Sequence, residues 1–338
     1  MRKYRKTEHI ENFLRSTYVG DALFSDIFLY NDSIPEIDYD EIDTSVDFLN
    51  KKVNFPLMIN AMTGGSNLSE EINRNLANVA KEFDLPMAVG SQTIALEDED
   101  SRKSFEIVRE VIRDGIVISN LSGFSSLDDA KKAVELLRAD AIQIHLNPAQ
   151  ELVQVEGERN FCGILKNVEE IVKKSEVPVI VKEVGFGMSP KTVKKLYDIG
   201  VRYVDISGYG GTNFFEIENL RDPDSDISDL FSWGIPTALS LIEADRLNLK
   251  DLYIISAGGV KNSMDIVKSI AAGASMTAIS GEILSYLVRG GYEYTLKYID
   301  GLIEKTKMLM MLSGAKNIEE LKKVDYKVTG KLKDLLGD

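Results

Sequence analysis

Short runs of apolar and β-branched residues recur along the chain, and amphipathic, charged segments separate them. The runs show almost no polar alternation, so each must be covered on both faces, which is how parallel sheets are built. We expect each run to be a β-strand. The eight runs are 55–62, 86–90, 116–122, 141–147, 178–185, 203–208, 252–259 and 275–281.

The segments between these runs repeat their apolar residues at spacings of three and four, which is typical of amphipathic helices. Ser, Asp or Asn often precedes the periodic region, and Gly200 and Gly273 follow two of them, as helix caps require. Eight strand–helix units close most simply into a (β/α)8 TIM barrel. The main alternative is an open doubly wound sheet, but the first strand–helix turn reads MTGGSN and not the GxGxxG of dinucleotide-binding folds.

Three parts of the chain do not fit the eight units: residues 1–54, the connection from Tyr209 to Gly234 and the tail after Gly290. We therefore expect residues 1–54 to be an N-terminal extension that covers the barrel mouth, 55–290 to be the barrel, and 291–338 to be a C-terminal helical tail packed on the barrel. A long insertion, from Tyr209 to Gly234, follows the sixth strand.

The composition is that of a globular protein, with 44% hydrophobic and 28% charged residues. The net charge of −14 argues against binding to nucleic acid or to an anionic membrane, because both attract basic surfaces. The single cysteine, Cys162, is expected to be a partly buried structural residue and fits a reducing compartment. With neither an apolar signal core nor a membrane-spanning stretch in the sequence, we expect a cytoplasmic protein.

In a β/α barrel the carboxyl ends of all strands open on one face, where active sites form. The stretch HLNPAQE brings His145, Asn147, Gln150 and Glu151 to this face, at the end of the fourth strand. A loop that only turned the chain would more often use Gly, Asp, Asn or Ser. Lys182 ends the next strand, and a buried lysine is costly unless it is paired or faces a ligand, so we expect it to be functional.

The seventh and eighth strands end in Gly258, Gly259, Ser280 and Gly281. Glycine lets the backbone approach a ligand closely, and N–H groups at helix N-termini bind anions. Barrels often hold a phosphate at these loops. Tight turns alone would also explain the glycines, but their position favours a phosphate site.

A basic cluster, RKYRKTEH, stands near the N-terminus of this acidic chain. Terminal charge runs are commonly solvated tails. If the cluster folds over the barrel mouth, however, Arg5, Lys6 and His9 would bind a polyanion such as a diphosphate.

Together these motifs resemble those of the type 2, flavin-dependent isopentenyl-diphosphate isomerases. HLNPxQE with KEVGFGMS is specific to that family, whereas the barrel glycines occur in many flavin barrels. Thr93 stands where the family often has Arg, and ISGEIL replaces a common Ala-Arg pair near the phosphate. The matching motifs run in order along nearly the whole chain: RKTEH, INAMTGG, GSQ, SNLS, IHLNPAQE, KEVGFGMS, GYGGTNF, FSWGIPTALSL and AGGVKNSMD.

The resemblance implies FMN, Mg²⁺ and NADPH as the reductant, a small diphosphate substrate, and a homo-oligomer, either a tetramer or an octamer. It also implies that Gln150 and Lys182 are catalytic and that Glu151 holds Mg²⁺. By the same resemblance, the substrate meets Arg5, Lys6, His9, His145, Asn147 and Gln150. FMN contacts Ala61, Met62, Thr63, Ser91, Asn120, Lys182, Ser207 and Thr212, and its phosphate lies on Gly258, Gly259, Ser280 and Gly281.

The implied reaction moves a double bond, converting isopentenyl diphosphate to dimethylallyl diphosphate without net oxidation. One alternative is an FMN-dependent barrel oxidoreductase of the 2-hydroxy-acid oxidase type, which would need a His with an Arg near the last strands. No histidine follows His145. The other alternative is a non-catalytic phospholigand-binding barrel, which would have no reason to gather Gln150, Glu151 and Lys182 at the mouth.

Overall fold

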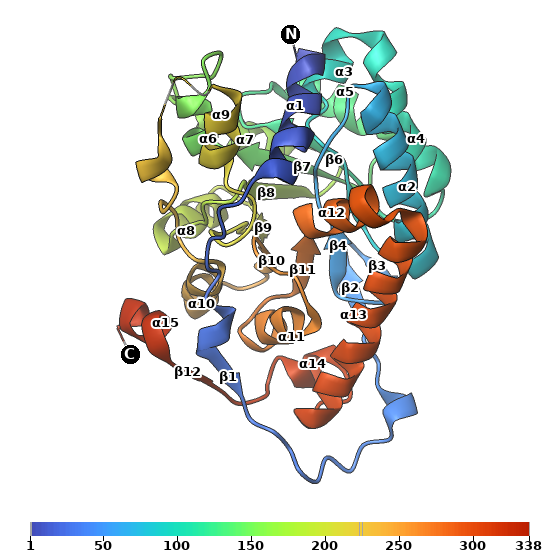
Figure 1. Cartoon of the computed structure of the whole chain (residues 1–338), viewed down its shortest axis with the longest axis vertical. Coiled ribbons are helices and arrows are strands. Elements are labelled where there is room, and N and C mark those ends of the chain that lie inside the picture. The colour runs from blue at the N-terminus through green and yellow to red at the C-terminus, as the bar shows by residue number, and fades with distance from the viewer. Residues whose placement is uncertain (1, 223, 225, 338) are drawn as a thin grey trace.

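The computed structural model describes residues 2–222, 224 and 226–337, and the side chains among them from residue 7 onward. In this part of the chain, eight parallel strands form a closed barrel (Figure 1). Each lies within an apolar run, which confirms the predicted TIM barrel. In order around the barrel they are β4 (Leu57–Ile59), β5 (Met87–Ala88), β6 (Val117–Ser122), β7 (Ala141–Leu146), β8 (Val179–Glu183), β9 (Tyr203–Asp205), β10 (Tyr253–Ala257) and β11 (Met276–Ile279), which pairs with β4.

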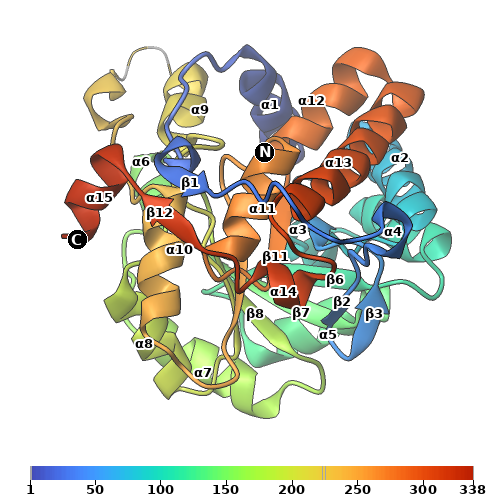
Figure 2. The same ribbon diagram turned by 90° about the horizontal axis from the view of Figure 1, so that it is seen from below.

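Helices follow the strands and surround the barrel (Figure 2). Ser66, Ser126, Ser189 and Asn262 each accept a backbone N–H bond at a helix N-terminus, as their positions predict. The helices are α2 (Asn67–Phe83), α3 (Thr93–Glu97), α4 (Lys103–Val111), α5 (Leu127–Leu137), α6 (Pro148–Val153), α7 (Ile164–Lys174), α8 (Pro190–Asp198), α9 (Phe214–Arg221), α10 (Thr237–Arg246), α11 (Ser263–Ala271) and α12 (Gly281–Gly290).

The register of the strands aligns the polar residues of the barrel interior. His145 on β7 is paired with Lys182 on β8, and Lys182 is paired in turn with Asp205 on β9. On the other side of β7, Asn120 of β6 is paired with Gln143. Because side chains alternate between the two faces of a strand, Gln143 and His145 share one face of β7. A buried polar layer therefore lies near the carboxyl ends of the strands.

The N-terminal segment packs against both ends of the barrel. Helix α1 (Arg2–Arg15) lies at the mouth, between α9 and α12 (Figures 1 and 2), where the guanidinium of Arg289 donates to the carbonyl of Leu14. The hairpin of β2 (Val46–Phe48) and β3 (Lys51–Val53) packs at the opposite end, where Phe48 contacts the rings of Tyr203 and Tyr253.

The C-terminal segment packs on the barrel and also meets the N-terminal segment. The long helix α13 (Tyr292–Leu312) lies against α11 and α12, and α14 (Ile318–Leu321) follows it. Strand β12 (Tyr326–Val328) then pairs antiparallel with β1 (Ile27–Leu29), and α15 (Gly330–Leu336) ends the described chain.

Two properties of the surface bear on the sequence-based expectations. Cys162 is exposed, so the expectation of a partly buried thiol was wrong. It lies in the loop between α6 and α7, where none of residues 155–163 is buried. No helix in the described part of the chain is both long and apolar enough to cross a bilayer.

Candidate active site

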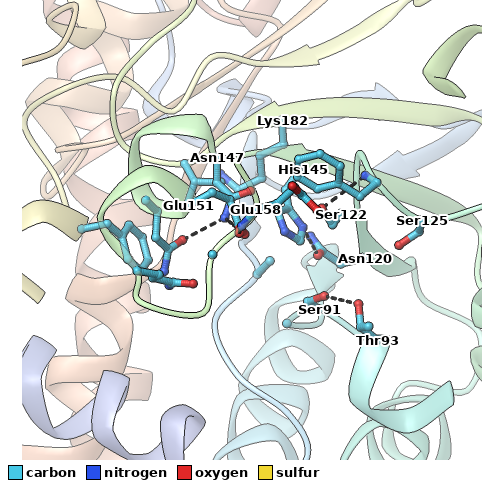
Figure 3. Close-up of a pocket in the computed structure, with 18 of the residues that line it drawn as sticks. Ser91, Thr93, Asn120, Ser122, Ser125, His145, Asn147, Glu151, Glu158 and Lys182 are labelled. Carbon is cyan, nitrogen blue, oxygen red and sulfur yellow. Dashed lines mark hydrogen bonds between the residues drawn. The ribbon is translucent and has the colours of Figure 1, made fainter. Parts of the chain in front are cut away.

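A cavity of about 530 Å³ opens at the carboxyl ends of the barrel strands (Figure 3). Its lining comes from the loops after β4 to β8, together with α1 and α9, so segments far apart in the sequence converge on it. Thr93 also lines it, and its hydroxyl lies 3.1 Å from that of Ser91. The predicted site residues that line the cavity are His9, Ala61, Met62, Ser91, Asn120, His145, Asn147, Gln150, Glu151 and Lys182.

The other predicted site residues lie elsewhere. Thr63 is buried in the turn after β4, and its hydroxyl bonds to that of Ser69 at 2.7 Å. Arg5 and Lys6 have their backbone in α1, but their side chains lie outside the described residues. The remaining predicted cofactor residues follow β9, β10 and β11, in the loops and at the start of α12: Ser207, Thr212, Gly258, Gly259, Ser280 and Gly281.

The stretch HLNPAQE forms the end of β7 and the start of α6. Pro148 opens the helix, where its missing N–H costs nothing. The side-chain amide of Asn147 then donates to Oε1 of Gln150 at 3.1 Å and to Oε1 of Glu151 at 3.0 Å. Oε2 of Glu151 accepts the N–H of Glu158 at 2.8 Å. Asn147 therefore holds the side chains of Gln150 and Glu151 side by side at the cavity wall.

Glu218 on α9 connects this wall to the N-terminal helix. Its Oε1 accepts from Nε2 of Gln150 at 3.2 Å and from Nε2 of Gln154 at 2.6 Å, and it lies 3.0 Å from Nε2 of His9. Arg221 pairs with its other oxygen. Burial raises the pKa of Glu218, but the hydrogen bond and charge of His9, with Gln154 and Arg221, outweigh burial and lower this pKa to about 2.

Lys182 is held inside the barrel by groups at the end of its own strand and of the next one. Its Nζ lies 3.2 Å from Oδ2 of Asp205, bonds to the hydroxyl of Ser207, and donates to the carbonyl of Glu183 at 2.9 Å. Ser207 in turn donates to Oδ1 of Asp205 at 2.8 Å. Asp205 is therefore the carboxylate partner that a buried lysine requires.

Four residues of this region were missed by the motif-based reasoning: Asn60, Gln143, Asp205 and Glu218. Asp205 had a signal, because a lone carboxylate in an apolar strand next to a buried lysine suggests a pair. Glu218 had none, since it lies in the insertion after the sixth strand and its role depends on how α9 and α1 pack.

The glycine loops form a backbone cradle. Gly258 and Gly259 have φ of 91° and 80°, and a Cβ on them would come within 2.1 Å and 2.6 Å of the carbonyl oxygens of Gly208 and Gly210. A Cβ on Gly281 would come within 2.5 Å of the ring of Phe13 on α1 and would lie 3.3 Å from the hydroxyl of Thr212. The side chain of Ser280 does not cap α12, so no side chain at that position competes for the first N–H groups of the helix. The close packing of these loops explains the glycines at 258 and 259, and the uncapped N-terminus of α12 fits a bound phosphate group.

A metal ion would need ligands from outside the protein. The described residues contain no group of three or more His, Cys, Asp or Glu side chains placed to hold a metal. Glu151 can supply one carboxylate, and Mg²⁺ is commonly held by one or two carboxylates with substrate phosphates and water. The donor set therefore fits Mg²⁺ brought with a diphosphate, and does not fit a preformed protein cage.

Comparison with known proteins places this site in a family. Residues 149–327 match the model of the FMN-dependent dehydrogenases. The isopentenyl-diphosphate delta-isomerase of Listeria welshimeri is 42% identical over 98% of this chain and 93% of its own length. The enzyme of the same name from Bacillus licheniformis is 43% identical over 97% of this chain and 94% of its own length.

Solved structures agree with the observed fold. A mandelate oxidase with a bound hydroxy acid superposes with a TM-score of 0.68 over 95% of each chain, at 15% identity. A putative lactate oxidase from Pediococcus acidilactici gives a TM-score of 0.69, at 17% identity, over 98% of this chain and 88% of that one. At such low identity these likenesses show the shared barrel alone. The full-length relatives and the FMN-dependent dehydrogenase match together show that the chain belongs to the FMN-dependent, type 2 isopentenyl-diphosphate delta-isomerases.

Proposed function

We propose that this protein interconverts isopentenyl diphosphate and dimethylallyl diphosphate, using reduced FMN and Mg²⁺, with NADPH as the reductant. The observation that carries the proposal is the gathering of His145, Gln150, Glu151 and Lys182 on one cavity wall. We also propose that the protein works as a homo-oligomer, as a tetramer or an octamer.

The residues of the cavity and the glycine cradle fit FMN. Ala61, Met62, Ser91, Asn120 and Lys182 would hold its ring system at the cavity wall. Bound reduced FMN would supply an electron-rich surface and a group that exchanges protons next to the substrate. Thr63, Ser207 and Thr212 would contact other parts of FMN. Its phosphate would lie on Gly258, Gly259, Ser280 and Gly281.

The diphosphate would be bound by other residues of the same cavity. His9 and His145 line it, and the basic Arg5 and Lys6 lie on the same helix as His9. Because the chain carries a net charge of −14, capture of a diphosphate needs such local positive charge. Glu151 would bind Mg²⁺ that is also bound to the diphosphate.

The chemical step adds a proton to one carbon of the substrate and removes one from a neighbouring carbon. Positive charge develops on a tertiary carbon between these events, so water must be excluded and the substrate held in one orientation. Gln150 is suited to orient the substrate or to relay a proton, because Asn147 and Glu218 fix both ends of its amide. Helix α1, which carries His9, would cover the mouth.

The 2-hydroxy-acid oxidases share the barrel, but their chemistry needs a histidine near the last strands. This chain has two histidines, His9 and His145, and neither lies there. The structural likeness to such oxidases therefore does not extend to the chemistry of the site.

An anaerobic assay tests the proposal. Isopentenyl diphosphate is incubated with the protein, FMN, Mg²⁺ and NADPH or dithionite, and dimethylallyl diphosphate is measured. We expect product only when FMN is reduced. In a separate aerobic assay with oxidised FMN, oxidation of lactate or mandelate by O₂, combined with no isomerisation in the first assay, would instead support the oxidase alternative. Binding of FMN without either reaction would support a non-catalytic barrel.

A further inference from the structure

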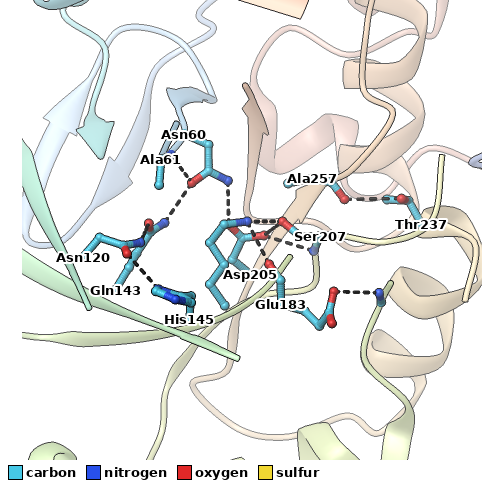
Figure 4. A network of polar contacts seen from close by, with 12 residues as sticks. Asn60, Ala61, Asn120, Gln143, His145, Glu183, Asp205, Ser207, Thr237 and Ala257 are labelled. Carbon is cyan, nitrogen blue, oxygen red and sulfur yellow. Dashed lines mark hydrogen bonds and ion pairs between the residues drawn. The ribbon is translucent and has the colours of Figure 1, made fainter. Parts of the chain in front are cut away.

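A chain of buried polar side chains crosses the barrel from Asp205 to His145 (Figure 4). The amide of Asn60 donates to Oδ2 of Asp205 at 2.7 Å, and Gln143 donates to Oδ1 of Asn60 at 3.0 Å. Asn120 donates to Oε1 of Gln143 at 3.0 Å, and its own Oδ1 lies 2.9 Å from Nδ1 of His145. Asn60, Gln143 and Asp205 are completely buried, so water cannot replace these bonds.

The direction of this chain is determined at the Asp205 end. An ionised carboxylate can only accept hydrogen bonds. The ammonium of Lys182 lies 3.2 Å from Oδ2 of Asp205, and the backbone N–H and hydroxyl of Ser207 donate to Oδ1. Asp205 is thus surrounded by donors, and the amide group of Asn60 that faces it must be the NH₂ group.

A backbone group fixes the same orientation independently. The N–H of Ala61, which can only donate, bonds to Oδ1 of Asn60 at 2.9 Å. Because this oxygen is an acceptor, the group of Gln143 that meets it must be its NH₂, and the oxygen of Gln143 must face Asn120. Asn120 then donates with its own NH₂ and turns its oxygen to His145. The ring nitrogen at that oxygen must carry a hydrogen.

We infer that Asp205, acting through Asn60, Gln143 and Asn120, holds the proton of the neutral His145 ring on Nδ1 and makes Nε2 the proton-accepting nitrogen of this ring. Asn60, Gln143 and Asp205 are positioning residues in this scheme, since they act on His145 through Asn120. The tautomer follows from the free protein's hydrogen bonds alone. One consequence rests on the proposed function: Nε2 can donate to a diphosphate oxygen only after the ring has gained a proton.

Gln143 offers a matched pair of variants. Gln143→Met has a similar size but neither donates nor accepts, so it separates Asn120 from Asn60 and lets the Asn120 amide take either orientation. In Gln143→Glu, a buried protonated carboxyl reproduces the original pattern, with its O–H donating to Asn60 and its other oxygen accepting from Asn120. We therefore expect the glutamate variant, and not the methionine variant, to keep the tautomer.

The test is ¹⁵N NMR of the full-length protein labelled in histidine, without and with FMN, at a pH where the rings are neutral. The chain has two histidines, so the spectrum of His9→Gln identifies the signals of His145. We expect the native protein and Gln143→Glu to show a protonated Nδ1 and an unprotonated Nε2. Gln143→Met should shift toward the Nε2–H form that histidine favours in water.

The inference is overturned if the native His145 carries its proton on Nε2, or if folded Gln143→Met keeps the native tautomer unchanged. The first of these measurements needs no substitution in the polar chain, so it tests the inference even if Gln143→Met fails to fold. The spectrum is recorded without substrate. If it showed the other tautomer, the inference would fail, but the proposed isomerase function would not be contradicted. Equally, an inactive protein with the expected tautomer would contradict the proposed function alone.

Discussion

At the scale of single residues, the site depends on buried charges whose partners are other buried side chains. Lys182 and Asp205 lie 3.2 Å apart inside the barrel, and both are almost fully removed from water. Removing one member of such a pair leaves the other as an uncompensated buried charge. Substitutions here will change stability as well as chemistry, and the two effects must be measured separately.

We predict that Lys182→Met weakens FMN binding and makes bound FMN harder to reduce, because a fixed cation stabilises the anionic reduced ring. The same variant should lose about 3–5 kcal/mol of stability through the unpaired Asp205. Urea unfolding and flavin fluorescence titration measure the two effects. The double variant Lys182→Met/Asp205→Asn should recover much of the stability and none of the FMN affinity. An unchanged FMN affinity, reduction potential and turnover would refute the role of Lys182.

We predict that Glu151→Gln abolishes most of the activity's response to Mg²⁺. The amide can still accept from Asn147, but it lacks the charge that binds a hard cation. The measurement is the rate as a function of Mg²⁺ concentration. Glu158→Gln is the control, since Glu158 lines the same cavity but bonds to the N–H groups of Arg159 and Asn160. A wild-type Mg²⁺ titration in Glu151→Gln would show that the ligand is wrongly assigned.

At the scale of elements, helix α9 positions α1 through its acidic side chains. Glu216 accepts the N–H groups of Thr17 and Tyr18, just after α1, at 2.8 Å and 3.0 Å. Glu218, two residues farther along α9, meets His9 within α1 and Gln150 at the cavity wall. The orientation of Gln150 and the docking of α1 are therefore coupled through α9.

We predict that Glu218→Gln loosens α1 and raises the KM for the diphosphate, because one amide oxygen cannot replace the carboxylate that several donors share. Trypsin cleavage within the first 15 residues should become faster. Glu8→Gln is the control: Glu8 pairs with Arg221 but is largely exposed, and such pairs are worth roughly 0–1 kcal/mol.

The pKa of Glu218 also sets a pH window for this contact. This pKa is about 2 in the folded protein and 4.5 in a model compound, so the stabilisation is complete above the higher value. It is lost as the pH falls from about 4.5 toward 2. Pepsin is active at these pH values and replaces trypsin for this measurement. Cleavage of α1 that was equally fast in the native protein and in Glu218→Gln at every pH of this window would contradict the role of Glu218 in docking α1.

The turn between β8 and α8 contains a second pH-sensitive carboxyl. Oε2 of Glu183 accepts from the N–H groups of Phe186 and Gly187, and burial, the dominant cause, raises the pKa of Glu183 to about 8. Between its unfolded value of 4.5 and 8, the folded state binds more protons than the unfolded state, so stability falls as the pH rises. We predict that Glu183→Gln removes this part of the slope. Unfolding by urea across this pH window measures it, and identical slopes in both proteins would contradict the raised pKa.

The elements of the barrel were predictable because their signal is local. A strand such as 57–59 is apolar at every position, and a helix such as 67–83 shows its period within its own sequence. The hairpin at 46–53 was not predicted, because its short strands gain stability only where Phe48 meets Tyr203 and Tyr253, about 150 and 200 residues later.

The candidate site was predictable only in part. HLNPAQE and Lys182 stood out because polar groups at buried strand ends are costly. The partners of these groups could not be read from the chain, because Asp205, Glu218 and Asn60 contact them through barrel register and helix packing. Gln143 is an example: an amide within an apolar run has no local signal that tells which side chains it will bridge.

At the scale of the whole molecule, the charge of the protein opposes its proposed substrate. The net charge is −14, and the basic cluster on α1 is the local exception at the mouth. Long-range attraction by that cluster would be screened by salt over a Debye length of about 10 Å at 0.1 M ionic strength.

We therefore predict that Arg5→Ala/Lys6→Ala raises the KM for the diphosphate at least about tenfold, from the loss of charge-assisted hydrogen bonds. The salt dependence of KM should become weaker in this variant, while FMN stays bound, because its proposed contacts lie on the barrel. Arg2→Ala/Lys3→Ala removes the same charge from the same helix and should have a smaller effect. Equal effects of the two double variants, or a wild-type KM in the first, would indicate that the cluster is a solvated tail that does not bind the diphosphate.

The pairing of β1 with β12 has a consequence for biosynthesis. Ile27 is completely buried in the folded protein, and its strand partner is Val328. A ribosome adding about 5–20 residues per second needs roughly 15–60 s to make the 299 residues that separate positions 29 and 328. During that time β1 is an open strand edge with an exposed apolar side chain, which chaperones and proteases recognise. Only a chain synthesised past residue 328 can close this edge.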